Sequence, residues 1–503
     1  MKKSIIFLIL ALTIMSLSVV SASENATDLD GPDVNDEVIS SDVPPDEVND
    51  TGVEYVKEDS EISANYTKGY ENFKTEFTVT LTSNGTDLAS KKIIINLNGN
   101  NYTRTTNESG QATLKIKLAK GTYDANYYFL GDNSTNPSNG SSKINVYSSK
   151  KTVLKLADEN INYRQGSGSI FIVRLLTDTG KAVKKQNVTF KVDGKIYTAV
   201  TTSEGYAKIF LSLNKGKHKV YYSFKANKPY LSSKGSTKIK VKEAIGKGDG
   251  YWVWASGMYS VSLQTLKERG TKQIFLHSHA VSSYGESAVA SWIAQAHKYG
   301  IKVHIWVQVF YDGTWVRPMK TDGTPDYGYM KKRASMAVRY AKIRGVDGIH
   351  LDYVRFGGTA HLYNDSAKAI NYVVKKTCIE VRKVKPNCII SAAVMPEPDM
   401  MLYYYGQDIP TISKYLDVIV PMAYKGNYEK TTPWIKEVTK FFVKQSNGAQ
   451  VWTGLQSYYS DDNVKRLPHS LLLKDAKTAK KGGASGIVLF RIGITNLLDF
   501  NKV

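Results

Sequence analysis

An internal repeat of 95 residues is followed by short apolar runs separated by helix-length segments. These two patterns predict a multidomain chain, with two all-β immunoglobulin-like sandwiches followed by an α/β (β/α)8 TIM barrel. The length agrees, because 503 residues are several times the roughly 100–200 of an ordinary domain. Hydrophobic residues make up 42% and charged residues 22% of the chain, which excludes a wholly disordered, collagen-like or coiled-coil protein.

Residues 1–22 have the layout of a signal peptide. Lys2 and Lys3 precede an apolar run over 5–17, and the small residues Val20-Ser21-Ala22 suit a cleavage site. The run is shorter than the about 20 residues that span a bilayer, which favours cleavage over a retained anchor. We therefore expect a secreted or cell-surface (extracellular) protein with no stable membrane span after signal cleavage.

Residues 23–61 are an acidic, disordered tether by composition. Positions 24–61 hold fourteen Asp or Glu against one Lys and are poor in aromatic residues. Because the whole chain carries a net charge of +21, residues 62–503 carry +32 once the signal and the tether are set aside. Such a field attracts polyanions. In an exported chain we expect a polysaccharide or cell-wall glycan as the partner, and no nucleic acid.

Residues 62–148 and 149–245 are two copies of one module. Six positions recur 95 residues later without a gap, as Gly85, Gly99, Tyr102, Gly110, Gly121 and Tyr127 match Gly180, Gly194, Tyr197, Gly205, Gly216 and Tyr222. Within each copy, β-branched and apolar runs alternate with turn residues about every 8–12 positions, as in a β-sandwich. Asn-x-Ser/Thr acceptor sites cluster before residue 190, which fits an exposed glycoprotein stalk.

From residue 246 to residue 503 the pattern changes to eight strand-plus-helix units, the usual number and length for a (β/α)8 barrel. One expected helix, 287–299, places Val289, Trp292, Ile293 and Ala296 on one face and stops at Gly300. The expected strands are 251–255, 273–277, 302–309, 348–353, 389–395, 418–422, 451–455 and 486–490. In such a barrel the active site lies at the C-terminal ends of the strands.

Two carboxylates follow neighbouring strands of the expected barrel. Asp352 ends the fourth strand on the same face as His350, so it points into the barrel mouth, and Glu397 comes just after the fifth strand. In glycoside hydrolysis one carboxyl group protonates the leaving oxygen while the other attacks or stabilises the sugar carbon. The pair therefore predicts a glycoside hydrolase. The structural alternatives are a salt bridge from Asp352 to Arg355 and an exposed loop acid at Glu397.

Four segments of this region carry a family resemblance: 347–356 (DGIHLDYVRF), 391–396 (SAAVMP), 405–408 (YGQD) and 418–424 (VIVPMAY). They resemble the glycoside-hydrolase TIM-barrel families of bacteria and archaea, which are distant relatives of the α-amylase and family 18 chitinase barrels. The resemblance implies a nucleophilic Asp352, an acid at Glu397, and contact of the Tyr424 hydroxyl with the substrate. The chitinase pattern Asp-x-x-Asp-x-Asp-x-Glu fails, because Val354 stands at its acid position. The two preceding copies resemble tandem immunoglobulin-like repeats of prokaryotic surface proteins.

Aromatic and polar side chains crowd the expected mouth. Flat rings suit the apolar faces of sugars, while amides and arginines bind hydroxyls or carboxylates. The expected substrate-binding residues are Tyr424, Arg355, Trp254, Trp306, Gln308, Tyr353, Trp452, Gln456 and Arg491. Packing of the same rings inside the barrel is the alternative.

No cofactor and no metal are expected. His277, His304 and His350 invite a metal assignment, but the later strands end without a further histidine, which favours hydrogen-bonded core histidines. Cys378 and Cys388 bracket a turn, where a local disulfide is an option in an exported protein.

Three functions stay open. The first is an exported glycoside hydrolase cleaving an extracellular or cell-wall polysaccharide, acidic in view of the basic chain, with pseudomurein as one candidate. The second is a non-catalytic surface glycan-binding adhesin. The third is a metal-dependent wall amidase or deacetylase.

Overall fold

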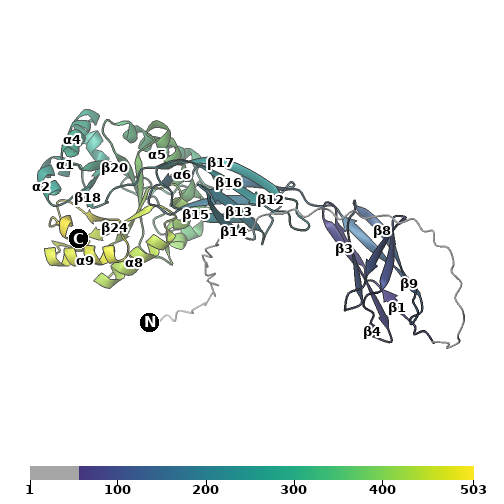
Figure 1. Ribbon diagram of the computed structural model, residues 1–503. Helices are drawn as coiled ribbons and strands as arrows, with labels where there is room; N and C mark the ends of the chain where they lie inside the picture. The colour runs from purple at the N-terminus through teal and green to yellow at the C-terminus, as the bar shows by residue number, and fades with distance from the viewer. Residues whose placement is uncertain (1–55) are drawn as a thin grey trace, which may run out of the picture. The chain divides into compact units, whose positions relative to one another are not determined.

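The computed structural model describes residues 56–503 (Figure 1). The predicted signal peptide, 1–22, and the predicted tether up to residue 55 lie outside the described residues. Backbone pairing begins before residue 62, since Glu58 exchanges hydrogen bonds with Ser134 and Asn136. The described chain forms two compact units, residues 56–69 with Lys74–Tyr147, and Tyr70–Phe73 with Ser148–Val503. No helix between residues 56 and 503 has both the length and the apolar composition that crossing a membrane requires.

Strands β1 to β9 form two sheets around one core. One sheet has the order β1-β3-β4, with β7 also paired to β3, and the other has the order β2-β9-β8-β5-β6. Alternate residues face inward, so Phe77, Val79 and Leu81 of β3 are buried. The bounds are β1 (Glu61–Ser63), β2 (Thr67–Tyr70), β3 (Lys74–Ser83), β4 (Thr86–Asp87), β5 (Lys92–Leu97), β6 (Asn100–Thr105), β7 (Gln111–Lys117), β8 (Gly121–Phe129) and β9 (Ser138–Tyr147).

Strands β10 to β17 repeat this arrangement with sheets β10-β12-β15 and β11-β17-β16-β13-β14. The strands β13, β14, β16 and β17 begin and end 95 residues after β5, β6, β8 and β9. The two copies therefore share the layout of their five-stranded sheets. The bounds are β10 (Thr152–Leu156), β11 (Tyr163–Arg164), β12 (Ser169–Thr177), β13 (Asn187–Val192), β14 (Lys195–Val200), β15 (Tyr206–Leu211), β16 (Gly216–Phe224) and β17 (Ser233–Lys242).

The rest of the chain contains eight parallel strands that close into a barrel in the order β18-β19-β20-β21-β22-β23-β24-β27 (Figure 1, teal to yellow). They overlap the eight runs predicted as strands, and a two-stranded hairpin, β25-β26, follows β24. The bounds are β18 (Gly250–Val253), β19 (Gln273–His277), β20 (Lys302–Gln308), β21 (Gly348–Asp352), β22 (Ile389–Val394), β23 (Val418–Ala423), β24 (Gln450–Gln456), β25 (Tyr458–Ser460), β26 (Asn463–Arg466) and β27 (Gly486–Phe490).

Five long helices cover the barrel: α4 (Glu286–Lys298), α5 (Tyr327–Lys342), α6 (Ser366–Val384), α8 (Thr432–Gln445) and α9 (His469–Lys481). The shorter ones are α1 (Gly257–Ser260), α2 (Leu263–Glu268), α3 (His279–Tyr284), α7 (Ile409–Ile412), η1 (Ala360–Leu362), η2 (Met401–Tyr405) and η3 (Phe500–Lys502).

The predicted fold class, two immunoglobulin-like sandwiches followed by an α/β (β/α)8 TIM barrel, is wrong. Helices make up only 24% of the structure. The connection from β18 to β19 contains only two short helices, of 4 and 6 residues. The connection from β22 to β23 contains a π-helix of 5 residues and an α-helix of 4 residues. Between β27 and residue 503 the only helix is the short η3. Pro396, Pro398 and Pro410 lie between β22 and β23, and proline interrupts helices because it lacks an N–H donor and clashes with the preceding turn. The repeated modules likewise pair a five-stranded sheet with a smaller one, and β11 runs parallel to β17.

Two hydrophobic clusters fill the barrel region. The larger one lies between the strands and the helices and includes Ile349 and Leu351 of β21. A second cluster includes Trp252, Phe275 and Trp452. Alternation along β21 turns His350 and Asp352 away from the helix side, so Asp352 ends the strand on the inner face of the barrel.

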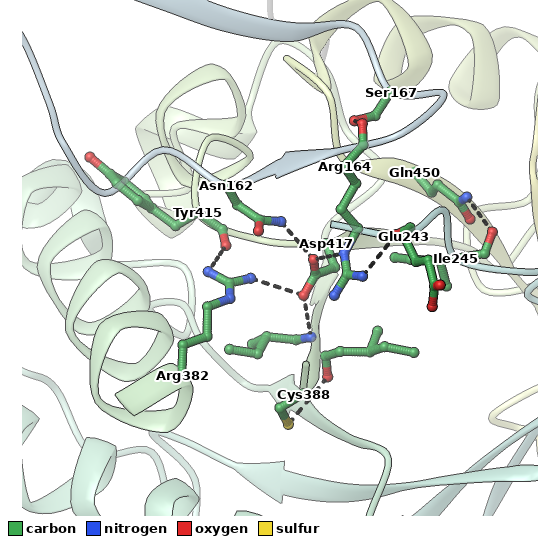
Figure 2. A network of polar contacts seen from close by, with 12 residues as sticks. Asn162, Arg164, Ser167, Glu243, Ile245, Arg382, Cys388, Tyr415, Asp417 and Gln450 are labelled. Carbon is green, nitrogen blue, oxygen red and sulfur yellow. Dashed lines mark hydrogen bonds and ion pairs between the residues drawn. The ribbon is translucent and has the colours of Figure 1, made fainter. Parts of the chain in front are cut away.

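The second module joins the barrel through a buried carboxylate, Asp417, just before β23 (Figure 2). Its oxygens accept hydrogen bonds from Asn162 Nδ2 at 2.6 Å and from Arg164 Nε, both in the module, and from Arg382 Nη2 on α6 at 2.9 Å. The amide of Ile390, on β22, donates at 2.9 Å. Burial acts to raise the pKa of Asp417, but the charges of Arg382 and Arg164 outweigh it and hold that pKa well below its usual range.

Candidate active site

Asp352 lies at the C-terminal end of β21 and is only 8% exposed. Its Oδ2 accepts a hydrogen bond from the indole Nε1 of Trp306 at 2.9 Å, and its Oδ1 accepts one from the Tyr353 amide at 2.7 Å. Tyr353 has a φ of 51°, so the chain turns sharply immediately after the carboxylate. Burial raises the pKa of Asp352, while the two hydrogen bonds and the charge of Arg355 act in the opposite direction.

Arg355 lies among three rings. Its guanidinium is 4.4 Å from the ring centre of Trp315, 5.3 Å from that of Tyr405 and 5.7 Å from that of Tyr353. Its Nη1 donates to the Phe356 carbonyl at 3.1 Å. Within residues 56–503 it forms no contact ion pair with Asp352, so the salt bridge that would make Asp352 purely structural is not present.

Glu397 lies on the loop after β22 and is half-buried. Its Oε2 accepts a hydrogen bond from the Tyr428 hydroxyl at 3.1 Å. Burial, followed by a hydrogen bond to Glu397, raises the pKa of Tyr405 to about 12. Burial and then the charge of Glu397 raise the pKa of Tyr428 as well. Glu397 is thus held between two tyrosines rather than standing free as a loop acid.

A buried amide, Gln407, ties the loops of the two carboxylates together. Its Nε2 donates to the Val354 carbonyl at 3.3 Å, and its Oε1 accepts from the Met395 amide at 3.0 Å. The side chain is 1% exposed, so both bonds are sheltered from water. Gln407 therefore fixes the segment after Asp352 against the segment before Glu397.

The charge of Asp352 also reaches Tyr424, at the end of β23. Burial, and next the charge of Asp352, raises the pKa of Tyr424 well above its usual value. A third carboxylate, Asp461 on the β25-β26 hairpin, contributes to the same effect. Asp461 accepts hydrogen bonds from the Tyr458 hydroxyl at 2.7 Å and from Asn427 Nδ2 at 2.8 Å.

Aromatic rings in close contact, tilted around Trp254 and stacked at Tyr353, form one wall near Asp352. Trp254 lies 4.2 Å from the ring centre of His277 and 5.1 Å from that of Trp306, and the guanidinium of Arg491 is 5.4 Å from the Trp254 ring. Tyr353 stacks on Tyr311 at 4.6 Å. Trp254, Tyr353 and Arg491 are all partly exposed, so their surfaces remain open to a ligand.

Three predicted substrate-binding residues have hydrogen-bond partners within the protein. Trp452 is fully buried, and its Nε1 donates to Gln450 Oε1 at 2.8 Å near the N-terminal end of β24. Gln456 holds the loop after β23, since its Oε1 accepts from the Gly426 amide at 3.0 Å and its Nε2 donates to Asn427 Oδ1 at 2.7 Å. Trp306 is 2% exposed and reaches Asp352 rather than solvent. Gln308, the last residue of β20, is half-buried.

Two barrel histidines each place one ring nitrogen beside a protein partner, while the other nitrogen of each is buried without one among the described residues. His304 Nε2 lies 2.9 Å from Gln273 Oε1, and His350 Nδ1 lies 2.8 Å from Ser391 Oγ. Burial lowers the pKa of His304 to about 4 and that of His350 well below its usual value, so both rings are neutral near pH 7. Among residues 56–503, no three His, Cys, Asp or Glu side chains form a group able to hold a metal ion.

The two cysteines are both buried and free, so the suggested disulfide between Cys378 and Cys388 does not form. Burial raises the pKa of the Cys378 thiol to about 11. A thiol of that kind is a poor nucleophile at neutral pH, because the thiolate is the reactive form.

Sequence reasoning missed Tyr405, Gln407, Tyr428 and Asp461. Tyr405 and Gln407 stand inside one of the segments that carry the family resemblance, but no pattern assigned them a role. Tyr428 and Asp461 come from loops after β23 and β24, and only the closed barrel brings them beside the loops after β21 and β22.

No family model and no curated protein matches this chain. Similar solved structures include the β-galactosidase of Marinomonas ef1 (10% identical, over 48% of this chain and 54% of that one, TM-score 0.39) and a family 18 chitinase of Cycas revoluta (12%, 49% and 95%, TM-score 0.37). Fibronectin(III)-like modules of Clostridium thermocellum CbhA are also similar (16%, 36% and 95%, TM-score 0.25). All three TM-scores lie below 0.5.

Proposed function

We propose that this chain is a glycoside hydrolase whose two carboxyl groups are Asp352 and Glu397. The observation that carries the proposal is a buried, ring-lined carboxylate at the C-terminal end of a barrel strand, free of a contact ion pair, with a second carboxylate on the loop of the neighbouring strand. Burial of a carboxylate costs several kcal/mol unless it is paired or functional.

The surroundings of the two carboxyl groups differ in the way that the chemistry requires. Asp352 is buried, and burial raises its pKa, which suits the group that donates a proton to the leaving oxygen. Glu397 accepts a hydrogen bond from Tyr428, which orients its carboxyl group to attack or stabilise the sugar carbon. This division of roles is the reverse of the one implied by the family resemblance.

The partly exposed rings and arginine beside Asp352 supply a binding surface for a sugar. Trp254 and Tyr353 offer flat apolar faces to the CH groups of the sugar ring, and Arg491 offers donors to hydroxyls or carboxylates. The substrate class that we propose is an extracellular or cell-wall polysaccharide. Export rests on the pattern of residues 1–22, and the preference for an acidic polymer rests on the basic charge of the remaining chain.

The first experiment measures reducing ends released from wall preparations and soluble polysaccharides. We expect wild-type protein to release them, and Asp352→Asn and Glu397→Gln each to lower the rate by about 100-fold or more, the lower range of general acid–base catalysis. Asp399→Asn is the matched control, because Asp399 is an exposed acid on the same loop as Glu397. Equal losses in all three variants would contradict the assignment.

A second experiment separates the two roles. An aryl glycoside with a good leaving group needs little help from an acid. Asp352→Asn should therefore retain much of its rate on such a substrate while Glu397→Gln does not. The opposite result would restore the roles implied by the family resemblance, and glycan binding without any hydrolysis would favour a surface adhesin.

A further inference from the structure

The outer face of one sheet in the second module is lined with lysines. In the sheet β11-β17-β16-β13-β14, alternate residues of β13, β16 and β17 are buried, and the residues between them face away from the core. These outward positions hold six exposed lysines: Lys191, Lys217, Lys219, Lys234, Lys238 and Lys240. The strands β13, β14, β16 and β17 contain no Asp or Glu, so nothing on them balances this charge.

The first module has the same sheet with only one of the six lysines, since Lys143 stands at the position of Lys238 and is paired there with Asp124. Ninety-five residues earlier, Thr122, Asp124 and Asn145 stand at the positions of Lys217, Lys219 and Lys240. Asn96 and Asn139 replace Lys191 and Lys234. Because the strand bounds and the register of the two sheets agree, the lysines are not a requirement of this sheet.

The lysine face continues into a cavity of about 390 Å³ between the module and the N-terminal ends of the barrel strands. The module lines it with Lys217, Lys240 and Lys242, and the barrel contributes Lys302 at the start of β20. The one acid in its lining, Glu243, is paired with Lys215. A neighbouring cavity of about 420 Å³ shares Lys240 and Lys242.

Two buried donors in this lining lack a partner. Lys242 Nζ is buried without a hydrogen bond among the described residues, and so is Arg164 Nη2. The other nitrogens of Arg164 are occupied, Nε by Asp417 and Nη1 by the Glu243 carbonyl at 3.1 Å (Figure 2). Buried donors without an acceptor are costly, and an oxyanion in the cavity would give both groups an acceptor.

We propose that the outer face of β17-β16-β13, together with the cavity at its end, binds a linear polysaccharide that carries carboxylate or phosphate groups. Lysines at alternate positions along a strand are about 7 Å apart, which gives a row of charges for a chain polymer. Ser223, Ser236 and Thr189 lie between them and offer hydroxyls to the sugar hydroxyls. Binding here is independent of the carboxylates at the barrel mouth.

A nucleic acid fits this face less well. Proteins that hold single strands stack successive bases on aromatic side chains. Among the outward positions of these strands only Tyr221 is aromatic, and the ammonium of Lys219 lies 4.5 Å from its ring centre. The face therefore offers charge and hydroxyls, but no series of rings.

The test measures binding of the full chain to four polymers: polygalacturonate for carboxylates, polyphosphate for phosphates, neutral dextran, and single-stranded DNA. We expect salt-sensitive binding to one or both of the first two and none to dextran. Replacing Lys217, Lys240 and Lys242 together by Gln should weaken binding at least about tenfold. A second triple replacement, at Lys191, Lys219 and Lys238, should weaken it without touching the cavity.

The matched control replaces Lys267, Lys331 and Lys477, three exposed barrel lysines, by Gln. It removes the same charge and should leave binding within about twofold. An equal loss in the control, equal affinity for dextran, or tighter binding of DNA than of both acidic polymers would overturn the proposal. Asp352→Asn should bind like wild type, so a failure of the catalytic proposal remains distinguishable from a failure of this one.

Discussion

Asp352 and Asp417 are both buried in the barrel, Asp352 near its C-terminal end and Asp417 near its N-terminal end. Asp417 is 2% exposed and receives two arginines, an asparagine amide and a backbone amide. Asp352 is 8% exposed and receives one indole and one backbone amide. The pKa of Asp417 is accordingly held down, and that of Asp352 is raised.

The contrast separates structural from chemical use of the same side chain. A carboxylate with two arginines is fixed as an anion and holds two parts of the fold together. A buried carboxyl group with fewer donors has a higher pKa, so it can take up and release a proton, and part of its surface stays free to contact a ligand. Burial alone does not distinguish the two cases, but the number and charge of the partners do.

The largest expected effect is on stability at Asp417. Asp417→Asn should lower the free energy of unfolding by about 3–5 kcal/mol, because it leaves Arg164 and Arg382 buried without their counter-ion. Chemical denaturation of the full chain measures this. Asp365→Asn, which removes an exposed partner of Lys368, is the control and should cost at most about 1 kcal/mol. A comparable loss in both variants would remove the distinction drawn for Asp417.

The pH dependence of that loss is the next effect. Because the pKa of Asp417 is lower in the folded than in the unfolded chain, its contribution is complete above about pH 5 and declines as the pH falls. At pH 3 the difference in free energy of unfolding between wild type and Asp417→Asn should be smaller than at pH 7 by about 1.3 kcal/mol. This value follows from a pKa near 3.9 for the carboxyl group in the unfolded chain. Denaturation curves at pH 7 and pH 3 test this, and a constant gap would contradict the assigned ionisation.

Asp352→Asn should change stability little. The amide keeps the shape of the carboxyl group but offers one acceptor oxygen to two donors, the Trp306 indole and the Tyr353 amide. Because the penalty for a buried charge disappears and offsets this loss, we expect a free energy of unfolding within about 1 kcal/mol of wild type. The sign follows from the raised pKa, since ionised Asp352 disfavours the folded state above that pKa and the penalty is relieved as the pH falls. A loss as large as that of Asp417→Asn would show that Asp352 is structural.

The smallest effect concerns the indole donor. The hydrogen bond from Trp306 lowers the pKa of Asp352. Trp306→Phe keeps an aromatic ring but removes this hydrogen bond, so the pKa of Asp352 should rise. The limb of the pH–rate profile that reports Asp352 should move to higher pH, and the rate should fall roughly threefold to tenfold, the worth of one net hydrogen bond. A rate loss without movement of the limb would indicate a packing effect only.

The sequence allowed the barrel strands and the position of Asp352 to be predicted, because both depend on local patterns. Apolar runs mark the strands, and period-two alternation turns Asp352 to the same side as His350. Local patterns did not predict which connections between the strands contain a long helix. Between β22 and β23 the spacing suggests a helix, but Pro396 and Pro398 follow the strand directly, and Pro410 stands in the first turn of the short α7.

Side-chain roles at the site were harder to predict because they depend on non-local contacts. Trp452 and Gln456 both lie on β24, yet Trp452 lies toward its N-terminal end, opposite the first residue of β27, and Gln456 is occupied by the loop around Asn427. Tyr428, which donates a hydrogen bond to Glu397, lies in the loop that follows β23. No spacing rule connects these residues before the barrel is closed.

The Asp417 junction also bears on how such a protein can be rearranged by recombination. Position 164 corresponds to position 69 in the first copy of the repeat, and position 162 corresponds to position 67. Those positions hold Gly69 and Thr67, neither of which supplies a cation. A deletion that fused the first copy directly to the barrel would leave Arg382 and the Ile390 amide as the donors to Asp417, with one cation instead of two. The two copies are therefore not interchangeable at this junction, because only the second supplies the arginine and the asparagine that bind Asp417.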